Sequence, residues 1–163
     1  MRRSVAGFGA TRDCRAVHDR SMRLAAVSDT HLPKFGKALP QALVDAIVAA
    51  RIDLIVHLGD FTEPFVPALF EALGPFDAVA GNNDGPELVA RFGRRKVLEI
   101  DGLRIGLTHG DLGLGSTTPQ RARGVFASEA VAAVLFGHSH APLVEIDGGA
   151  VRAQLRFFDD RSV

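Results

Sequence analysis

The chain has 163 residues, of which 47% are hydrophobic and 23% charged, so it can form one domain with a substantial core. Its 19 basic and 19 acidic residues give a formal net charge of zero, which offers no sign of a nucleic-acid or membrane partner. No apolar run approaches the ~20 residues of a membrane helix, and the single cysteine, Cys14, can form no internal disulfide, which favours a cytoplasmic protein.

Residues 1–21 differ from the rest of the chain. They contain five arginines and show no sustained period of two or of 3.6 residues. We interpret this segment as a disordered extension or as the product of a mis-annotated upstream start codon, because Met22 directly precedes the first predicted strand. The predicted domain therefore covers residues 22–163.

The next part of the chain alternates between buried strands and amphipathic helices. The apolar run Leu24–Val27 is typical of a strand buried on both faces, and it ends abruptly at Ser28-Asp29-Thr30-His31. After a loop with Pro33 and Gly36, the pattern predicts a helix from Pro40 to about Ala50, a strand over Asp53–Leu58, a helix over Pro64–Leu73, a strand over Phe76–Ala80 and a helix from Pro86 to about Phe92.

Hairpin signals then appear. Asp101-Gly102 separates the predicted strands Val97–Ile100 and Leu103–Leu107, which is a strong two-residue hairpin signal. A glycine-rich loop over Leu112–Thr118 follows, and the remaining predictions are a helix from Pro119 to about Ser128, a strand over Val131–Phe136, and a second hairpin of Leu143–Ile146 and Val151–Leu155 around Asp147-Gly148-Gly149. This order of elements predicts a mixed α/β fold built in layers.

Polar side chains follow five of the predicted strands, and they are Asp29 and His31, Asp60, Asn82 with Asn83 and Asp84, His109, and His138 with His140. Because the carboxyl ends of strands gather at one edge of an α/β sheet, we expect these groups to meet there. Each has a simpler explanation when taken alone, since Asp after a strand is often a turn residue or a helix cap. His57 is expected to be a core residue or to support the site from behind.

The donor set is typical of a divalent metal site. Two carboxylates, one amide oxygen and four imidazoles suit Mn²⁺, Fe²⁺, Zn²⁺, Co²⁺ or Ni²⁺ better than Ca²⁺ or Mg²⁺, and the absence of thiolates argues against a structural zinc site. Seven ligands exceed one tetrahedral site but fit two metals that share a carboxylate. Such pairs clamp the attacking and leaving oxygens of a phosphoryl displacement.

The spacing of these residues resembles a known family. Asp29-x-His31, Gly59-Asp60, Gly81-Asn82-x-Asp84, Thr108-His109-Gly110 and Gly137-His138-x-His140 are similar to the five motifs of the calcineurin-like metallophosphoesterases. The short layout without a cap resembles the small YfcE-type phosphodiesterase branch, and the resemblance covers Met22 to Ile146. It implies a four-layer α/β/β/α sandwich of two mixed sheets, with a dinuclear metal centre on one edge.

The resemblance also implies roles for individual residues. The first metal would be held by Asp29, His31, Asp60 and His140, and the second by Asp60, Asn82, His109 and His138. Asp60 would bridge the two metals together with a hydroxide that attacks phosphorus in line, and Mn²⁺ is the first expectation for the metal. Asp60, Asn82, Asn83, Asp84 and His109 are the predicted catalytic residues.

The sequence departs from the family pattern at two places. The residue after the third-motif Asn is His in much of the superfamily, where it is a candidate general acid, and often Cys in the small branch. Here it is Asn83, which cannot act as an acid, so activated aryl esters should be favoured over alkyl esters. The tail from Val151 to Val163 lacks the usual N-P-G-S turn. Codons can be chosen for residues 150–157 that, when read one base later, encode a sequence close to this turn. We therefore hypothesise a frameshift in the gene.

Three interpretations follow from the sequence. The first is a metal-dependent phosphodiesterase that acts on a small phosphate ester, in the cytoplasm and without a membrane partner. The second is a non-catalytic interaction module on the same fold, for which the retromer subunit that shares the fold is a precedent. The third is a damaged gene product whose ligands are competent but whose tail folds poorly. Exposed hairpin edges are compatible with a homodimer.

Overall fold

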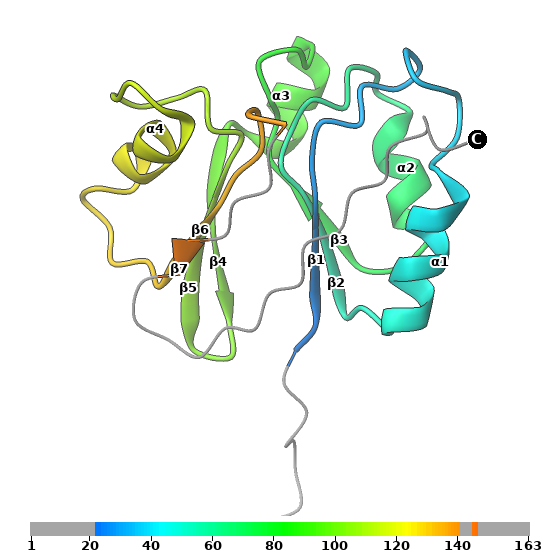
Figure 1. Ribbon diagram of the computed structural model, residues 1–163, viewed down its shortest axis with the longest axis horizontal. Coiled ribbons are helices and arrows are strands. Elements are labelled where there is room, and N and C mark those ends of the chain that lie inside the picture. Colours follow the sequence, from blue (N-terminus) through cyan, green and yellow to red (C-terminus); the bar gives the residue numbers. More distant parts are fainter. Residues whose placement is uncertain (1–21, 141–144, 147–163) are drawn as a thin grey trace, which may run out of the picture.

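A computed structural model describes residues 22–140 and 145–146. Two β-sheets lie against each other, and helices flank the outer side of each sheet (Figure 1). The predicted mixed α/β architecture of two sheets with helices is therefore confirmed. Within the described residues, no helix has both the length and the apolar character that a membrane crossing requires. The predictions for residues 1–21, for residues 147–163 and for most of the second hairpin lie outside the described part of the chain.

The first sheet is parallel and has the strand order β1-β2-β3. Its strands are β1 (Leu24–Val27), β2 (Leu54–His57) and β3 (Phe76–Ala78). The helices that follow these strands are α1 (Gln41–Ala50), α2 (Val66–Glu71) and α3 (Pro86–Phe92). Proline lies directly before α1 and in the first turn of α2 and α3, where its missing N–H costs nothing.

The second sheet is mixed and has the order β4-β5-β6-β7. Its strands are β4 (Arg95–Ile100), β5 (Leu103–Thr108), β6 (Ala133–Leu135) and β7 (Glu145–Ile146), and helix α4 (Thr118–Val125) lies between β5 and β6 in the chain. The pairing of Ile100 with Leu103 confirms the hairpin predicted at Asp101-Gly102. Strands β5 and β6 are parallel, so the residues that follow each of them reach the same edge.

Some element boundaries differ from those the sequence predicts. Strand β4 begins at Arg95, two residues early, because polar residues of an edge strand can face water and so break the apolar run. Strand β3 ends two residues early, since the N–H of Ala80 donates to the carbonyl of Gly93 instead of to a neighbouring strand. Helix α4 begins at a capping box formed by Thr117 and Gln120, which the prediction missed.

Successive side chains of β2 point to opposite faces of the sheet and so pack into two separate parts of the core. Ile55 packs with residues of α1, α2 and α3 on the outer face of the first sheet. Val56 and Leu58 pack instead against Leu107 and its neighbours, in the layer between the two sheets. Both faces of β2 are therefore buried, which fixes the position of the loop that follows it.

His57, the last residue of β2, is fully buried in the outer part of the core. Its ring stacks on Phe61 with a centroid separation of 3.8 Å and lies near Phe70. Burial first, and then the nearby imidazole of His109, lower the pKa of His57 from 6.5 to about 3, although Asp60 opposes the shift. Nδ1 accepts the Gly59 N–H, so Nε2 donates to the Thr30 hydroxyl and ties the loop after β1 to β2.

The buried neutral His57 predicts a specific acid sensitivity. Above pH 6.5 both the native and the unfolded chain hold this ring neutral, but between pH 6.5 and about 3 only the unfolded chain takes up the proton. Stability should therefore fall with pH by about 1.4 kcal/mol per unit from this group. Urea unfolding in EDTA between pH 4 and 8 gives the free energy of unfolding at each pH. Below pH 6.5, its slope against pH should be smaller by about one proton for His57→Gln than for the parent chain. Equal slopes would refute this prediction.

Candidate metal centre

Six of the predicted ligands lie on loops that meet at one edge of the two sheets. These loops directly follow β1, β2, β5 and β6, so the strand ends deliver the side chains to a common region (Figure 1). The residues brought together in this way are Asp29, His31, Asp60, His109, His138 and His140.

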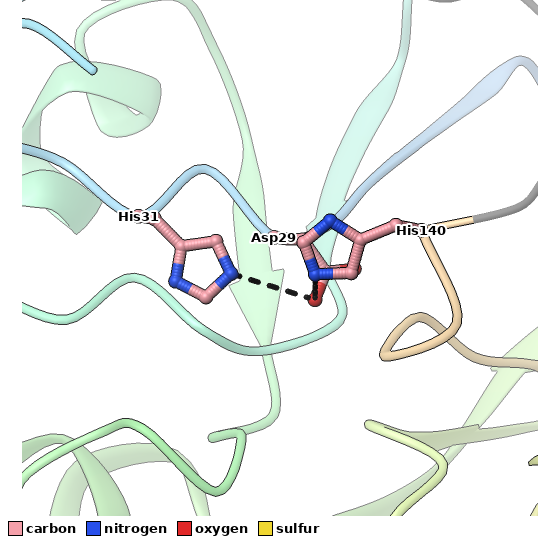
Figure 2. A group of neighbouring side chains, drawn as sticks. All are labelled: Asp29, His31 and His140. Carbon is pink, nitrogen blue, oxygen red and sulfur yellow. Dashed lines mark ion pairs between the residues drawn. The ribbon is translucent and has the colours of Figure 1, made fainter. Parts of the chain in front are cut away.

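The first group consists of Asp29, His31 and His140, whose ligand atoms all lie within 4.8 Å of one another (Figure 2). Oδ1 of Asp29 is 4.0 Å from Nε2 of His31 and 3.5 Å from Nε2 of His140. The two imidazole rings stack with centroids 5.4 Å apart. The side chain of His140 is 62% exposed, so this side of the site is open to solvent.

The second group consists of Asp29, Asp60 and His109 and is deeper. Nε2 of His109 is 3.4 Å from Oδ2 of Asp60 and 4.0 Å from Oδ1 of Asp29. His31 joins the two groups, because its Nε2 is also 3.6 Å from Oδ2 of Asp60. Asp60 and His109 are almost completely buried.

The hydrogen bonds that the described residues make to Asp29 satisfy only one of its two carboxylate oxygens. Oδ2 accepts from the hydroxyl of Ser28 at 2.6 Å and from the backbone N–H of His138 at 3.0 Å. Oδ1 is buried and has no hydrogen-bond partner among the described residues, yet imidazole nitrogens surround it. A buried carboxylate oxygen is rarely left unsatisfied. This orphaned oxygen and the mixed nitrogen and oxygen donors fit a divalent cation.

Hydrogen bonds also influence the charge states of Asp60 and His109, the two buried residues of the second group. Burial opposes ionisation of Asp60, but hydrogen bonds from His109 and from Asn83 outweigh it and hold the pKa of this carboxyl well below its usual range. Burial likewise opposes charging of His109, but the hydrogen bonds to Asp60 and to the Leu58 carbonyl, together with the Asp60 charge, raise its pKa above 6.5. The Nδ1–H of His109 donates to that carbonyl at 2.7 Å, which leaves Nε2 facing the carboxylates.

The residues of the third motif, Gly81-Asn82-Asn83-Asp84, have different surroundings. The Nδ2 and the backbone N–H of Asn83 donate to the two carboxylate oxygens of Asp60, at 2.6 and 3.0 Å. Asn82 is exposed, and no hydrogen bond or ion pair links its side chain to another described residue, so its predicted role as a ligand stays a prediction. Asp84 accepts the backbone N–H groups of Asp60, Thr62 and Gly81, at 2.7 to 2.9 Å, and thereby joins the loops after β2 and β3.

The backbone at the site is strained. Asp29, His31, Asp60, His138 and His140 all have positive φ angles, between 46° and 68°. This left-handed region is uncommon for residues other than glycine, and such residues concentrate at functional sites. Backbone hydrogen bonds compensate, since the N–H of Asp29 donates to Gly59 and that of His31 donates to the carbonyl of Asp60.

Two glycines allow the loops to approach the carboxylates. A Cβ at Gly81 would overlap the carboxylate of Asp60, and a Cβ at Gly137 would overlap Ser28 and lie 2.8 Å from Oδ2 of Asp29. Ser28, which directly precedes Asp29, was not among the predicted site residues. No pattern in the sequence distinguishes its hydrogen bond from that of an ordinary surface serine.

Two archaeal relatives are similar to this chain. A probable metallophosphoesterase of Methanothermobacter thermautotrophicus is 35% identical over 128 residues, which cover 76% of this chain and 69% of the relative. A second probable metallophosphoesterase, from Methanocaldococcus jannaschii, is 31% identical over 125 residues, which cover 77% of this chain and 62% of the relative. The chain therefore spans about two thirds of the length of these relatives.

Solved structures share the fold. An archaeal phosphodiesterase superposes with a TM-score of 0.58 at 25% identity, covering 76% of this chain and 77% of that one. Vps29 of Entamoeba histolytica, in a single-mutant form, superposes with a TM-score of 0.64 at 21% identity, covering 77% of this chain and 69% of that one.

The family model for the calcineurin-like phosphoesterase superfamily domain matches residues 22–155, which include every residue of the cluster described above. The chain therefore belongs to the calcineurin-like phosphoesterase superfamily.

Proposed function

We propose that the protein is a cytoplasmic phosphodiesterase that depends on two divalent metal ions. The observation that carries this proposal is the buried Oδ1 of Asp29, which lies within 4.0 Å of an imidazole nitrogen from each of three histidines and has no hydrogen-bond partner among the described residues. Family membership supports a metal-dependent phosphoesterase, and the archaeal phosphodiesterase neighbour supports diesters as the substrate class.

The proposed ligands divide into two sets that share Asp60. Asp29, His31, Asp60 and His140 would hold one cation, and Asp60, Asn82, His109 and His138 the other. When bound, the cations would lower the pKa of a water for in-line attack on phosphorus and neutralise charge on the phosphate oxygens; Mn²⁺ is the first candidate, with Fe²⁺, Zn²⁺, Ni²⁺ and Co²⁺ as alternatives.

The protein supplies orientation. The hydrogen bonds of Asp84 and Asn83 to the loop and to the carboxylate keep Asp60 ionised and fixed in place. The carbonyl of Leu58 orients the ring of His109, and the N–H of His138 orients Asp29. Such supporting contacts raise ligand basicity and fix the tautomer of a ligating histidine. An interaction module remains the alternative, because the Vps29 neighbours share the fold.

Substitution of the shared carboxylate should remove metal binding and activity together. We expect Asp60→Asn to lower Mn²⁺-dependent hydrolysis of bis(p-nitrophenyl) phosphate by more than about 100-fold. Mn²⁺ should raise the melting temperature of the parent chain but not of the variant, because only the parent binds it in the native state. Asp45→Asn, on the exposed side of α1, is the matched control and should behave like the parent. A fully active Asp60→Asn would disprove the proposal.

Metal binding should compete with a proton on His109. The hydrogen bond and charge of Asp60 raise the pKa of this imidazole above its ordinary value, so the proton that a cation must displace is held more tightly than on a free histidine. Affinity for Mn²⁺ should therefore fall as the pH is lowered from 8 to 6. Calorimetric titration in buffers of different ionisation enthalpy measures the released proton, and a binding enthalpy independent of the buffer would contradict this prediction.

A substitution at position 83 should supply the general acid that Asn83 cannot provide. Asn83→His introduces a group that can protonate a poor leaving group. With an alkyl p-nitrophenyl phosphate diester, the rate of alcohol release should therefore rise by about tenfold or more relative to the rate of p-nitrophenol release. Asn83→Ala removes the same hydrogen bond to Asp60 without adding an acid and is the matched control. An equal leaving-group preference in the two variants would show that position 83 does not protonate the leaving group.

A further inference from the structure

An exposed aromatic ring lies directly beside the candidate metal centre. Phe35 is 57% exposed, and its ring centroid lies 6.3 Å from that of His31, at an interplanar angle of 78°. His31 in turn contacts Asp60 and stacks on His140. A phosphate held by the cluster would therefore lie one imidazole ring away from Phe35.

The turn that presents Phe35 is anchored at its base. Leu32 is 3% exposed and belongs to the outer core, and its carbonyl accepts the hydroxyl of Thr62 from the loop after β2. Within the turn, the N–H of Lys34 donates to the carbonyl of His31 at 2.9 Å, and the N–H of Gly36 donates to that of Pro33. The backbone that carries the exposed ring is thus held in place relative to His31, which reduces the ordering that a ligand would have to impose.

A cation accompanies the ring. The Nζ of Lys34 lies 5.2 Å from the Phe35 centroid, and no carboxylate of the described residues forms an ion pair with it. An ammonium that lies over an exposed aromatic ring complements a group that carries both a phosphate charge and a flat ring. Single exposed apolar residues are common, but Phe65, which is also an exposed aromatic residue, has no ring contact with the cluster among the described residues.

We propose that Phe35 and Lys34 form a subsite for a planar aromatic substituent of the phosphate ester, so that the enzyme prefers aryl or nucleoside esters over small alkyl esters. This inference rests on the proposed phosphodiesterase function, because it concerns the organic group of the same substrate. The ring would stack on Phe35 while the ammonium of Lys34 neutralises the phosphate that the ester carries.

Fluorescence offers a test that does not require catalysis. The chain contains no Trp and no Tyr, so Phe35→Trp introduces a single strong fluorophore at the proposed subsite. Titration of the Mn²⁺-loaded variant with phenylphosphonate should give a saturable change in emission, whereas methylphosphonate should give none. Leu103→Trp is the matched control, because Leu103 is exposed at the start of β5, opposite to the end that carries His109. Equal responses to both ligands, or no response, would overturn the subsite.

Kinetics provides the second readout. Methyl p-nitrophenyl phosphate and phenyl p-nitrophenyl phosphate share a leaving group and differ only in the retained substituent. Phe35→Ala should lower the phenyl-over-methyl ratio of kcat/KM about tenfold, mainly through the KM for the phenyl ester, whereas Leu103→Ala should leave the ratio unchanged. An equal loss on both esters would mean that Phe35 only supports His31 and would overturn the subsite. If the parent chain hydrolyses neither ester, the phosphodiesterase proposal fails, and the fluorescence titration alone decides the subsite.

Discussion

The carboxylates of Asp29 and Asp60 are held within 4.8 Å of each other in a largely buried setting. Two like charges at such a distance repel, and burial removes the water that would screen them. Hydrogen bonds to Asn83, Ser28 and the backbone of His138 satisfy some of the oxygens but leave one of Asp29 without a donor among the described residues. The imidazoles around this pair carry positive charge when protonated and are candidate ligands for a cation.

The scaffold must be rigid to keep this charge in place. The two parts of the core bury both faces of β2, so the loop that carries Asp60 cannot move independently of the sheets. Asp84 then joins that loop to the next one through three backbone N–H groups, and His57 ties the loop after β1 to β2. Positive φ angles at Asp29 and Asp60 are tolerated because these surrounding contacts determine the backbone.

The fold alone does not decide between an enzyme and an interaction module, because a single fold can host unrelated functions. The arrangement of side chains is more informative. A surface that served only for docking would have no need of two neighbouring carboxylates surrounded by imidazoles, nor of a histidine oriented by a backbone carbonyl. The exposed ring of Phe35 lies beside this cluster, where we propose that the organic group of the ester binds.

The sequence by itself determined the order of strands and helices and the placement of the candidate ligands at strand ends, because buried parallel strands are continuous apolar runs that end in polar turns. The hairpin at Asp101-Gly102 followed in the same way from local turn chemistry. Only the tertiary structure decided that Asp84 accepts backbone N–H groups, that Asn83 rather than Asn82 reaches Asp60, and that one oxygen of Asp29 has no hydrogen bond from the described residues. Those outcomes depend on loop dihedral angles and on contacts between residues far apart in the chain, which no local pattern encodes.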